Sequence, residues 1–169
     1  MAAGAGPEPK LSMMEPWRSD PARMELPCFH LSIPAEDLDA TAAWYGRVLG
    51  CVPGRRSEAA LILDLGGHQL VAQRCVEAPQ QDQRGIYPRH FGLVLPSLSA
   101  WEQLRDAVAA AGESFAVEPK CRYPGGPLEH RSFFLRDPSG NWLEFKHYTH
   151  GEAVLGCREQ AAVGDPDFR

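Results

Sequence analysis

Two histidines and one glutamate stand out because all three are metal-ligand types that recur at comparable points of the sequence. His30 and His90 each begin a short apolar, alternating stretch, and Glu144 lies inside a third one. Two imidazoles and one carboxylate form a facial ligand set, which leaves open positions on a divalent ion, most often Fe(II) and otherwise Mn(II). A chelating substrate and a second small molecule would then bind side by side on the metal.

The elements that must position these residues form an internal repeat of about 60 residues. Each half begins with an alternating strand pattern that is followed by an amphipathic helix. In the first half we predict a strand at 28–34, a helix at 37–49, and strands at 60–65 and 68–74. In the second half we predict a strand at 90–95, a helix from a Ser99–Glu102 capping box to about Ala111, and strands at 115–123, 131–135 and 141–146.

Turn residues join the last two strands of each half and fix how the halves align. Gly66-Gly67 is a hairpin signal in the first half, and Asp137-Pro-Ser-Gly140 is a turn in the second. With the first strands aligned, His30 falls on His90. With Gly67 placed on Gly140, Glu144 falls on Val71, so the fourth equivalent position is apolar.

Strand alternation predicts where these side chains point. Leu31 and Ile33 share the face that packs on the helix, so His30 points the other way, and the same alternation applies to His90 and Glu144. We therefore expect an α+β domain at 27–149. It consists of two tandem β-α-β-β-β modules, at about 27–76 and 88–149, whose sheets pair to form one open cavity that holds the three ligands.

Composition narrows the class of protein. The chain has 169 residues, 44% of them hydrophobic, and its net charge of −5 with no basic run argues against a nucleic-acid surface. Its five cysteines are odd in number and show no CxxC spacing, so we expect reduced thiols. No apolar run suits a membrane span or a signal peptide, which favours a cytoplasmic protein. We interpret 1–26 as a disordered leader and 150–169 as a polar tail.

Between Pro27 and Tyr148 the sequence resembles the vicinal oxygen chelate superfamily, which includes glyoxalases, type I extradiol ring-cleaving dioxygenases and fosfomycin-resistance transferases. The similar stretches are Phe29–Leu38, Trp44-Tyr45 with Val48–Gly50, His90–Val94 and, most specifically, Phe133–Glu144. The resemblance implies a metal-binding role for His30, His90 and Glu144.

The resemblance also indicates which branch of the superfamily the sequence is most similar to. Glyoxalase-like members carry a fourth ligand where this chain has Val71, whereas extradiol enzymes and fosfomycin transferases use two histidines and a glutamate. Extradiol enzymes also carry an acid-base histidine near the position of His68, and His130 is the nearest match to a second one. Phe134 replaces the tyrosine that both three-ligand branches place there, and Tyr87, Tyr123 or Tyr148 would have to substitute for it.

The segment between Lys120 and Arg131 is dense in polar and turn residues just before a predicted core strand. Arg122, His130 and Arg131 would suit a clamp for an anionic or phenolate oxygen of a substrate, and an ordinary charged hairpin explains them equally well. Tyr87, just ahead of His90, is a further candidate for substrate binding.

Three functions remain open at this point. The first is an extradiol-type dioxygenase that acts on a small aromatic diol. The second is a glyoxalase-like isomerase or a thiol transferase, which would not consume O2. The third is a binding protein that sequesters a small molecule, against which the complete ligand set argues. Such two-module chains close the cavity either within one chain or by exchange in a homodimer.

Overall fold

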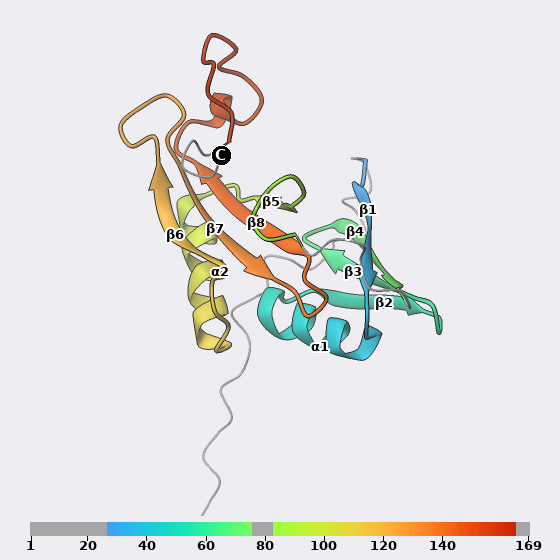
Figure 1. Ribbon diagram of the computed structural model, residues 1–169. Coiled ribbons are helices and arrows are strands. Elements are labelled where there is room, and N and C mark those ends of the chain that lie inside the picture. The colour runs from blue at the N-terminus through green and yellow to red at the C-terminus, as the bar shows by residue number, and fades with distance from the viewer. Residues whose placement is uncertain (1–26, 76–82, 165–169) are drawn as a thin grey trace, which may run out of the picture.

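The computed structural model describes residues 27–75 and 83–164, and it contains two modules of the same construction (Figure 1). The first comprises β1 (His30–Ala35), α1 (Leu38–Leu49), β2 (Val52–Arg56), β3 (Ala60–Leu65) and β4 (His68–Arg74). The second comprises β5 (Phe91–Val94), α2 (Leu98–Ala110), β6 (Val117–Arg122), β7 (His130–Arg136) and β8 (Trp142–Tyr148), and a 3₁₀ turn, η3 (Gly151–Ala153), follows it. The predicted α+β fold of two tandem β-α-β-β-β modules is confirmed.

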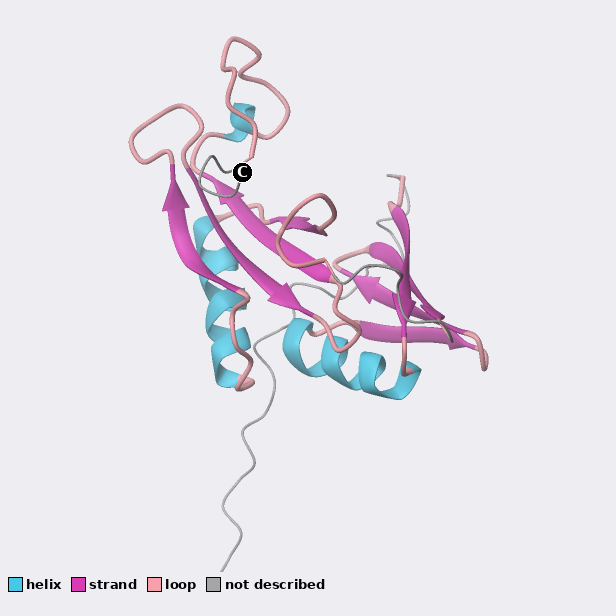
Figure 2. Ribbon diagram, viewed as in Figure 1, coloured by secondary structure: helices cyan, strands magenta, loops and turns pink. Residues whose placement is uncertain are grey.

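Each module folds into a four-stranded sheet with the same strand order. The first sheet runs β1-β4-β3-β2 and the second β5-β8-β7-β6. β1 lies parallel to β4, and β5 lies parallel to β8, while the other neighbours are antiparallel. Figure 2 shows each helix lying against the sheet of its own module, so neither α1 nor α2 covers the opposite face of its sheet.

The helices begin and end where their capping residues stand. The Asp37 carboxylate accepts hydrogen bonds from the amides of Asp39 and Ala40, and Gly50 ends α1 with a φ of 65°. The capping box predicted at Ser99 is wrong. Ser97 is the N-cap of α2, because its hydroxyl accepts from the amide of Ala100. A second serine two residues earlier offered the same chemistry, and the helix begins at that one.

β2 was not predicted from the sequence. It contains Pro53 and Gly54, which interrupt strand patterns, and all its residues are exposed. Its pairing with β3 shifts register between Pro53 and Arg56, as expected of an edge strand. The strand therefore carries neither an alternating pattern nor a buried face by which the sequence could reveal it.

One hydrophobic core spans both modules and lies between the helices and the sheets. Polar contacts also join the two modules, and we call the region where they meet the junction. The Tyr45 hydroxyl of α1 donates to Asp137 at 3.0 Å, and Asn141 Nδ2 donates to the Pro34 carbonyl at 2.9 Å. Arg47 Nη1 also donates to the Ala111 carbonyl at 2.7 Å. The first two of these contacts join buried or half-buried groups, and the third is made by an exposed arginine. Together they hold the two modules in one relative orientation.

Within the described ranges, no helix is long and apolar enough to cross a membrane.

Candidate active site

His90 and Glu144 face each other where β5 meets β8. Gly92 is the register partner of Glu144, and a side chain at position 92 would collide with the Glu144 backbone, so glycine permits this close approach. His90 Nε2 lies 3.2 Å from Glu144 Oε2. Its other nitrogen, Nδ1, donates to the Ile86 carbonyl at 2.7 Å, because a carbonyl oxygen only accepts. A backbone contact of this kind orients metal-binding histidines in general.

Lys146 is a second partner of the same carboxylate. Its Nζ lies 2.9 Å from Glu144 Oε2, and Glu144 is 7% exposed. Burial raises the pKa of Glu144, but hydrogen bonds from His90 and Lys146, together with the Lys146 charge, outweigh it and hold the pKa below its usual value. The Glu144 hydrogen bond in turn raises the pKa of His90. The carboxylate is therefore ionised at neutral pH.

His90, Glu144 and Lys146 line a cavity of about 610 Å³ on the face of the second sheet that lies opposite α2. The cavity lining brings together all three tyrosines that could substitute for the missing one at Phe134, and Phe134 itself. Its polar lining includes the side chains of Tyr87, His90, Arg122, Tyr123, His130, Glu144, Lys146 and Tyr148. A cavity of this size suits a small organic molecule.

The registers of three strands explain why these side chains share one face. His130 pairs with Arg122 on one side and with Tyr148 on the other, and Ser132, two residues on, pairs with Lys146. Since alternate residues of a strand point to the same face, His130 and Lys146 lie on the face of Glu144. The His130 ring packs against Tyr148 at a centroid distance of 4.7 Å.

His130 is the titratable group of this cavity best suited to accept a proton. Its Nδ1 donates to the Leu128 carbonyl at 2.9 Å, which leaves Nε2 as the basic nitrogen. Burial lowers the pKa of His130, and the nearby charges of Lys146 and Arg122 lower it further. The imidazole is therefore neutral at physiological pH.

His30, the third predicted ligand, lies apart from the other two. It is exposed on β1, and its Nδ1 contacts Gln69 Oε1 at 2.7 Å. Across 27–75 and 83–164, no three His, Cys, Asp or Glu side chains are placed to hold one metal ion. Within the described part of one chain, His30 therefore does not complete a three-ligand cluster with His90 and Glu144, and the metal-binding role of the three residues stays a prediction.

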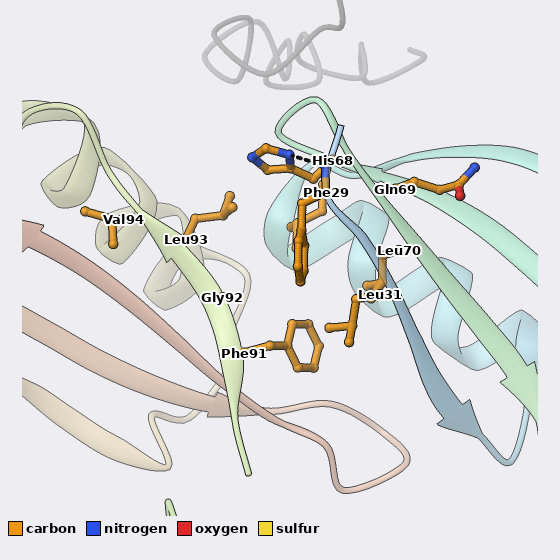
Figure 3. A pocket seen from close by; sticks show the side chains of 10 residues that line it. Phe29, Leu31, His68, Gln69, Leu70, Phe91, Gly92, Leu93 and Val94 are labelled. Atoms are coloured by element: carbon orange, nitrogen blue, oxygen red, sulfur yellow. Dashed lines mark hydrogen bonds between the residues drawn. The ribbon is translucent and has the colours of Figure 1, made fainter. Parts of the chain in front are cut away.

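His68 lies in a different cavity from His130. This smaller cavity, of about 330 Å³, is formed where β1 and β5 face each other (Figure 3). His68 Nδ1 accepts from the Phe29 amide at 3.4 Å, and the surrounding side chains of Phe29, Leu31 and Phe91 are apolar. Within one chain, His68 therefore does not share the cavity that holds His90 and Glu144.

The residues predicted to bind the substrate do not all line the same cavity. Arg122 and Tyr87 line the larger cavity, whereas Arg131 lines neither cavity. Arg131 follows His130 in β7, so strand alternation turns it to the opposite face, where its Nη1 lies 3.8 Å from Glu129 Oε1. A polar loop in the sequence does not reveal which of its residues share a face until the strand register is known.

Two contributors to the site were not identified from the sequence. Lys146 shares the face of Glu144, and its position two residues along the same strand was the available signal. The second is the segment from Ala153 to Gly164, which lines the cavity from outside the sheet. The Tyr123 hydroxyl donates to the Gly164 carbonyl at 2.8 Å. This segment lies within the predicted polar tail and shows no pattern that predicts a contact.

Comparison with known proteins adds to this geometry. The family model described as Glyoxalase/Bleomycin resistance protein/Dioxygenase superfamily matches residues 28–145. A glyoxalase/bleomycin resistance protein/dioxygenase from Alicyclobacillus acidocaldarius is 36% identical over 76% of this chain and 96% of its own, with a TM-score of 0.71. No curated protein matches the chain.

More distant structures share the fold alone. A glyoxalase/bleomycin resistance protein/dioxygenase from Nocardioides is 18% identical over 75% of this chain and 85% of its own, with a TM-score of 0.58. A lactoylglutathione lyase from Agrobacterium tumefaciens is 20% identical over 72% of this chain and 92% of its own, with a TM-score of 0.55.

Proposed function

This chain belongs to the Glyoxalase/Bleomycin resistance protein/Dioxygenase superfamily, and from that premise we propose that it is a metal-dependent dioxygenase acting on a small aromatic diol. The observation that carries the proposal is the His90–Glu144 pair, which opens into a cavity that also holds His130 and three tyrosines. A pair of metal-ligand side chain types and a proton acceptor beside an open cavity are the groups that would bind and deprotonate a diol on a metal ion.

The residues present fit a divalent metal in part. His90 Nε2 and Glu144 Oε2 converge, and the backbone contact of His90 Nδ1 suits a ligand histidine. Glu144 is ionised, so it provides the anionic ligand. A facial set needs one further donor, for which His30 has the right type. Bound there, Fe(II) or Mn(II) would supply Lewis acidity and open positions for the diol and O2.

We assign His30 of a second copy of the chain to the third position. Within one chain, the Tyr45–Asp137 and Asn141–Pro34 hydrogen bonds fix the two sheets relative to each other, so His30 cannot swing to His90. His30 is nevertheless exposed, with Nδ1 held by Gln69 and Nε2 left to bind a ligand. A twofold dimer would form two equivalent sites, each with His30 from one copy and the His90–Glu144 pair from the other. We call these two parts half-sites.

The protein side chains then divide the remaining work. His130 Nε2 is neutral and accepts the proton that the diol loses on binding. Tyr123 and Tyr148, whose rings lie 6.0 and 4.7 Å from that of His130, surround it with phenol groups. The segment from Ala153 to Gly164 lines the same cavity from the side opposite the sheet. Both atoms of O2 would enter the ring-opened product, so no external reductant is required.

The test is O2 consumption by anaerobically purified protein loaded with Fe(II) or Mn(II) and given catechol. We expect ring cleavage with one O2 consumed per diol, and its loss in Glu144→Gln. Conversion of a substrate without O2 would transfer the assignment to the isomerase or thiol-transfer branch. Tight metal-free binding of a small molecule without turnover would instead indicate a binding protein.

A further inference from the structure

Positively charged side chains outnumber negatively charged ones in the cavity on the second sheet, which also holds the His90–Glu144 pair. Arg122, Lys146 and Arg158 line it, whereas Glu144 is the one carboxylate among its described lining residues. A divalent metal at His90 and Glu144 would add to the excess. Because a low-dielectric cavity concentrates such a field, its preferred occupant is an anion.

Arg122 and Lys146 act on the same region of this cavity. Arg122 is the last residue of β6 and is 6% exposed, and its Nε lies 3.5 Å from the Ser132 hydroxyl. Ser132 is the register partner of Lys146. Both positive charges also contribute to lowering the pKa of His130. The two cations therefore flank His130, one on each neighbouring strand.

Apolar side chains line the rest of the space. Phe134 is 1% exposed and lies edge-on to His90 at a centroid distance of 5.4 Å, and Ile86 is 3% exposed beside it. Leu128 and Val163 also belong to the apolar part of the lining. An anion with an apolar body fits this arrangement better than a compact, fully hydrated anion such as phosphate.

We infer that the substrate of this cavity is an aromatic carboxylate, whose carboxyl group is bound by Arg122 and Lys146 while its ring oxygens face His90 and Glu144. The inference rests on the proposed function and specifies its substrate class. A guanidinium presents two parallel N–H groups that match a carboxylate, and Lys146 adds a point charge. The ring would lie between Phe134 and the segment from Ala153 to Gly164.

Isothermal titration of the full chain with benzoate and with benzamide tests the carboxyl subsite. The two probes differ in charge and have almost the same shape, and neither has a diol that could chelate a metal. We expect benzoate to bind at least about tenfold more tightly, the usual effect of a charge-assisted pair. Equal affinity for the two probes, or binding of neither, would overturn the inference.

Variants of Arg122 test whether this residue causes the preference for benzoate over benzamide. Arg122→Met should bring the two affinities within about threefold of each other, and Arg122→Lys should restore part of the difference because it restores the charge. Arg105→Gln is the matched control: Arg105 lies on α2, which covers the opposite face of the same sheet, and it pairs with Asp106. A benzoate preference that persists in a folded Arg122→Met protein would overturn the assignment to Arg122.

The outcome is independent of the proposed chemistry. If benzoate is preferred and no diol consumes O2, the carboxylate subsite stands and the dioxygenase proposal fails. If catechol is cleaved and 3,4-dihydroxybenzoate is not preferred over 3,4-dihydroxybenzamide, the dioxygenase stands and the carboxylate inference fails. The wild-type comparison needs no variant, so it remains decisive even if the buried Arg122 proves essential for folding.

Discussion

Val71 of the first module and Glu144 of the second occupy the same position in their sheets. Val71 is the register partner of Ser32, and Glu144 is the register partner of Gly92, in the two equivalent parallel strand pairs. In the second module the carboxylate at this position lies 3.2 Å from His90. The first module offers a histidine, His30, but an apolar side chain at the matching position. The two half-sites are thus unequal.

This inequality makes Val71→Glu informative. By analogy with His90 and Glu144, a carboxylate at position 71 would lie within reach of His30 and supply a fourth metal ligand. We expect metal affinity to rise by about tenfold or more, because an anionic ligand is added, and turnover to fall because a position needed by the substrate is filled. Metal titration and steady-state kinetics measure the two effects.

Val71→Gln is the matched control, because it has the same size and no charge. Val71 is buried, so both substitutions should lower the stability of the metal-free protein, and only the glutamate variant should recover stability when metal is added. A Val71→Glu enzyme with full turnover and unchanged metal affinity would show that this position is remote from the metal.

Mixing two inactive variants tests whether the site is shared between copies. His30→Ala and Glu144→Gln should each lose turnover. If His30 of one copy completes the site of the other, a heterodimer of the two variants contains one intact site. Full exchange should then restore about a quarter of wild-type activity, since half of the dimers are mixed and each has one of two sites intact. No recovery after verified exchange would place the whole site within one chain.

Tyr45→Phe should weaken the junction between the modules. The Tyr45 hydroxyl is buried and donates to Asp137 at 3.0 Å, so its loss leaves one carboxylate oxygen with one donor fewer. We expect a loss of about 1–3 kcal/mol in the free energy of unfolding. Tyr123→Phe is the comparison in urea denaturation, because its hydroxyl contacts the exposed Gly164 carbonyl and its removal should cost less. Equal losses in the two variants would contradict the role given to the junction.

Cys51 gives a prediction for alkaline pH. Burial, aided by the charge of Asp64, raises the pKa of its thiol from 9.0 to about 12. Because the folded-state pKa lies above the unfolded one, this stabilising contribution is complete below pH 9 and is lost as the pH rises toward 12. The free energy of unfolding should fall by about 1.4 kcal/mol per pH unit for this proton.

The control for this slope is Cys51→Ala, which should lower stability overall and flatten the alkaline decline by one proton. Tyr45 titrates in the same direction at higher pH, since burial also raises its pKa, so the slope should not vanish. Urea denaturation between pH 8 and 11 gives both slopes. Parallel curves for wild type and variant would show that Cys51 does not titrate in this way.

Local patterns predicted most of the fold. The hairpin at Gly66-Gly67, the helix from Asp37 to Gly50 and the equivalence of Val71 with Glu144 all follow from features within a few residues, and the structure has each of them. β2 was not predicted, because Pro53 and Gly54 mask an exposed edge strand that is defined by its partner β3.

The site was predictable only as far as one module extends. Strand alternation indicates the face on which His30 and His90 lie, but it carries no information on how two sheets are oriented relative to each other. That orientation depends on contacts such as Tyr45 with Asp137, between residues 92 positions apart in the sequence. The same limit explains why the sequence could not show that His68, the first acid-base candidate, and His130, the nearest match to a second one, lie in different cavities.

His130 and His68 should differ in their effect on turnover and on its pH dependence. His130 lines the cavity of His90 and Glu144, whereas His68 contacts the Phe29 amide in the smaller cavity. We expect His130→Gln to lower turnover on a diol by on the order of 10²–10⁴, the usual contribution of a positioned acid-base group, and by more than His68→Gln does. Neither variant should lose the metal, because neither residue is assigned as a ligand.

The pH dependence of kcat/KM shows which histidine accepts the proton. Burial holds the pKa of His130 below its ordinary value of 6.5, so the basic form persists to a lower pH than for an exposed histidine. The acid limb of kcat/KM should therefore fall below pH 6.5 in the wild type, and it should be absent from the residual activity of His130→Gln. A profile that keeps this limb in His130→Gln and loses it in His68→Gln would transfer the proton-accepting role to His68 and require a second copy of the chain to deliver that residue to the metal.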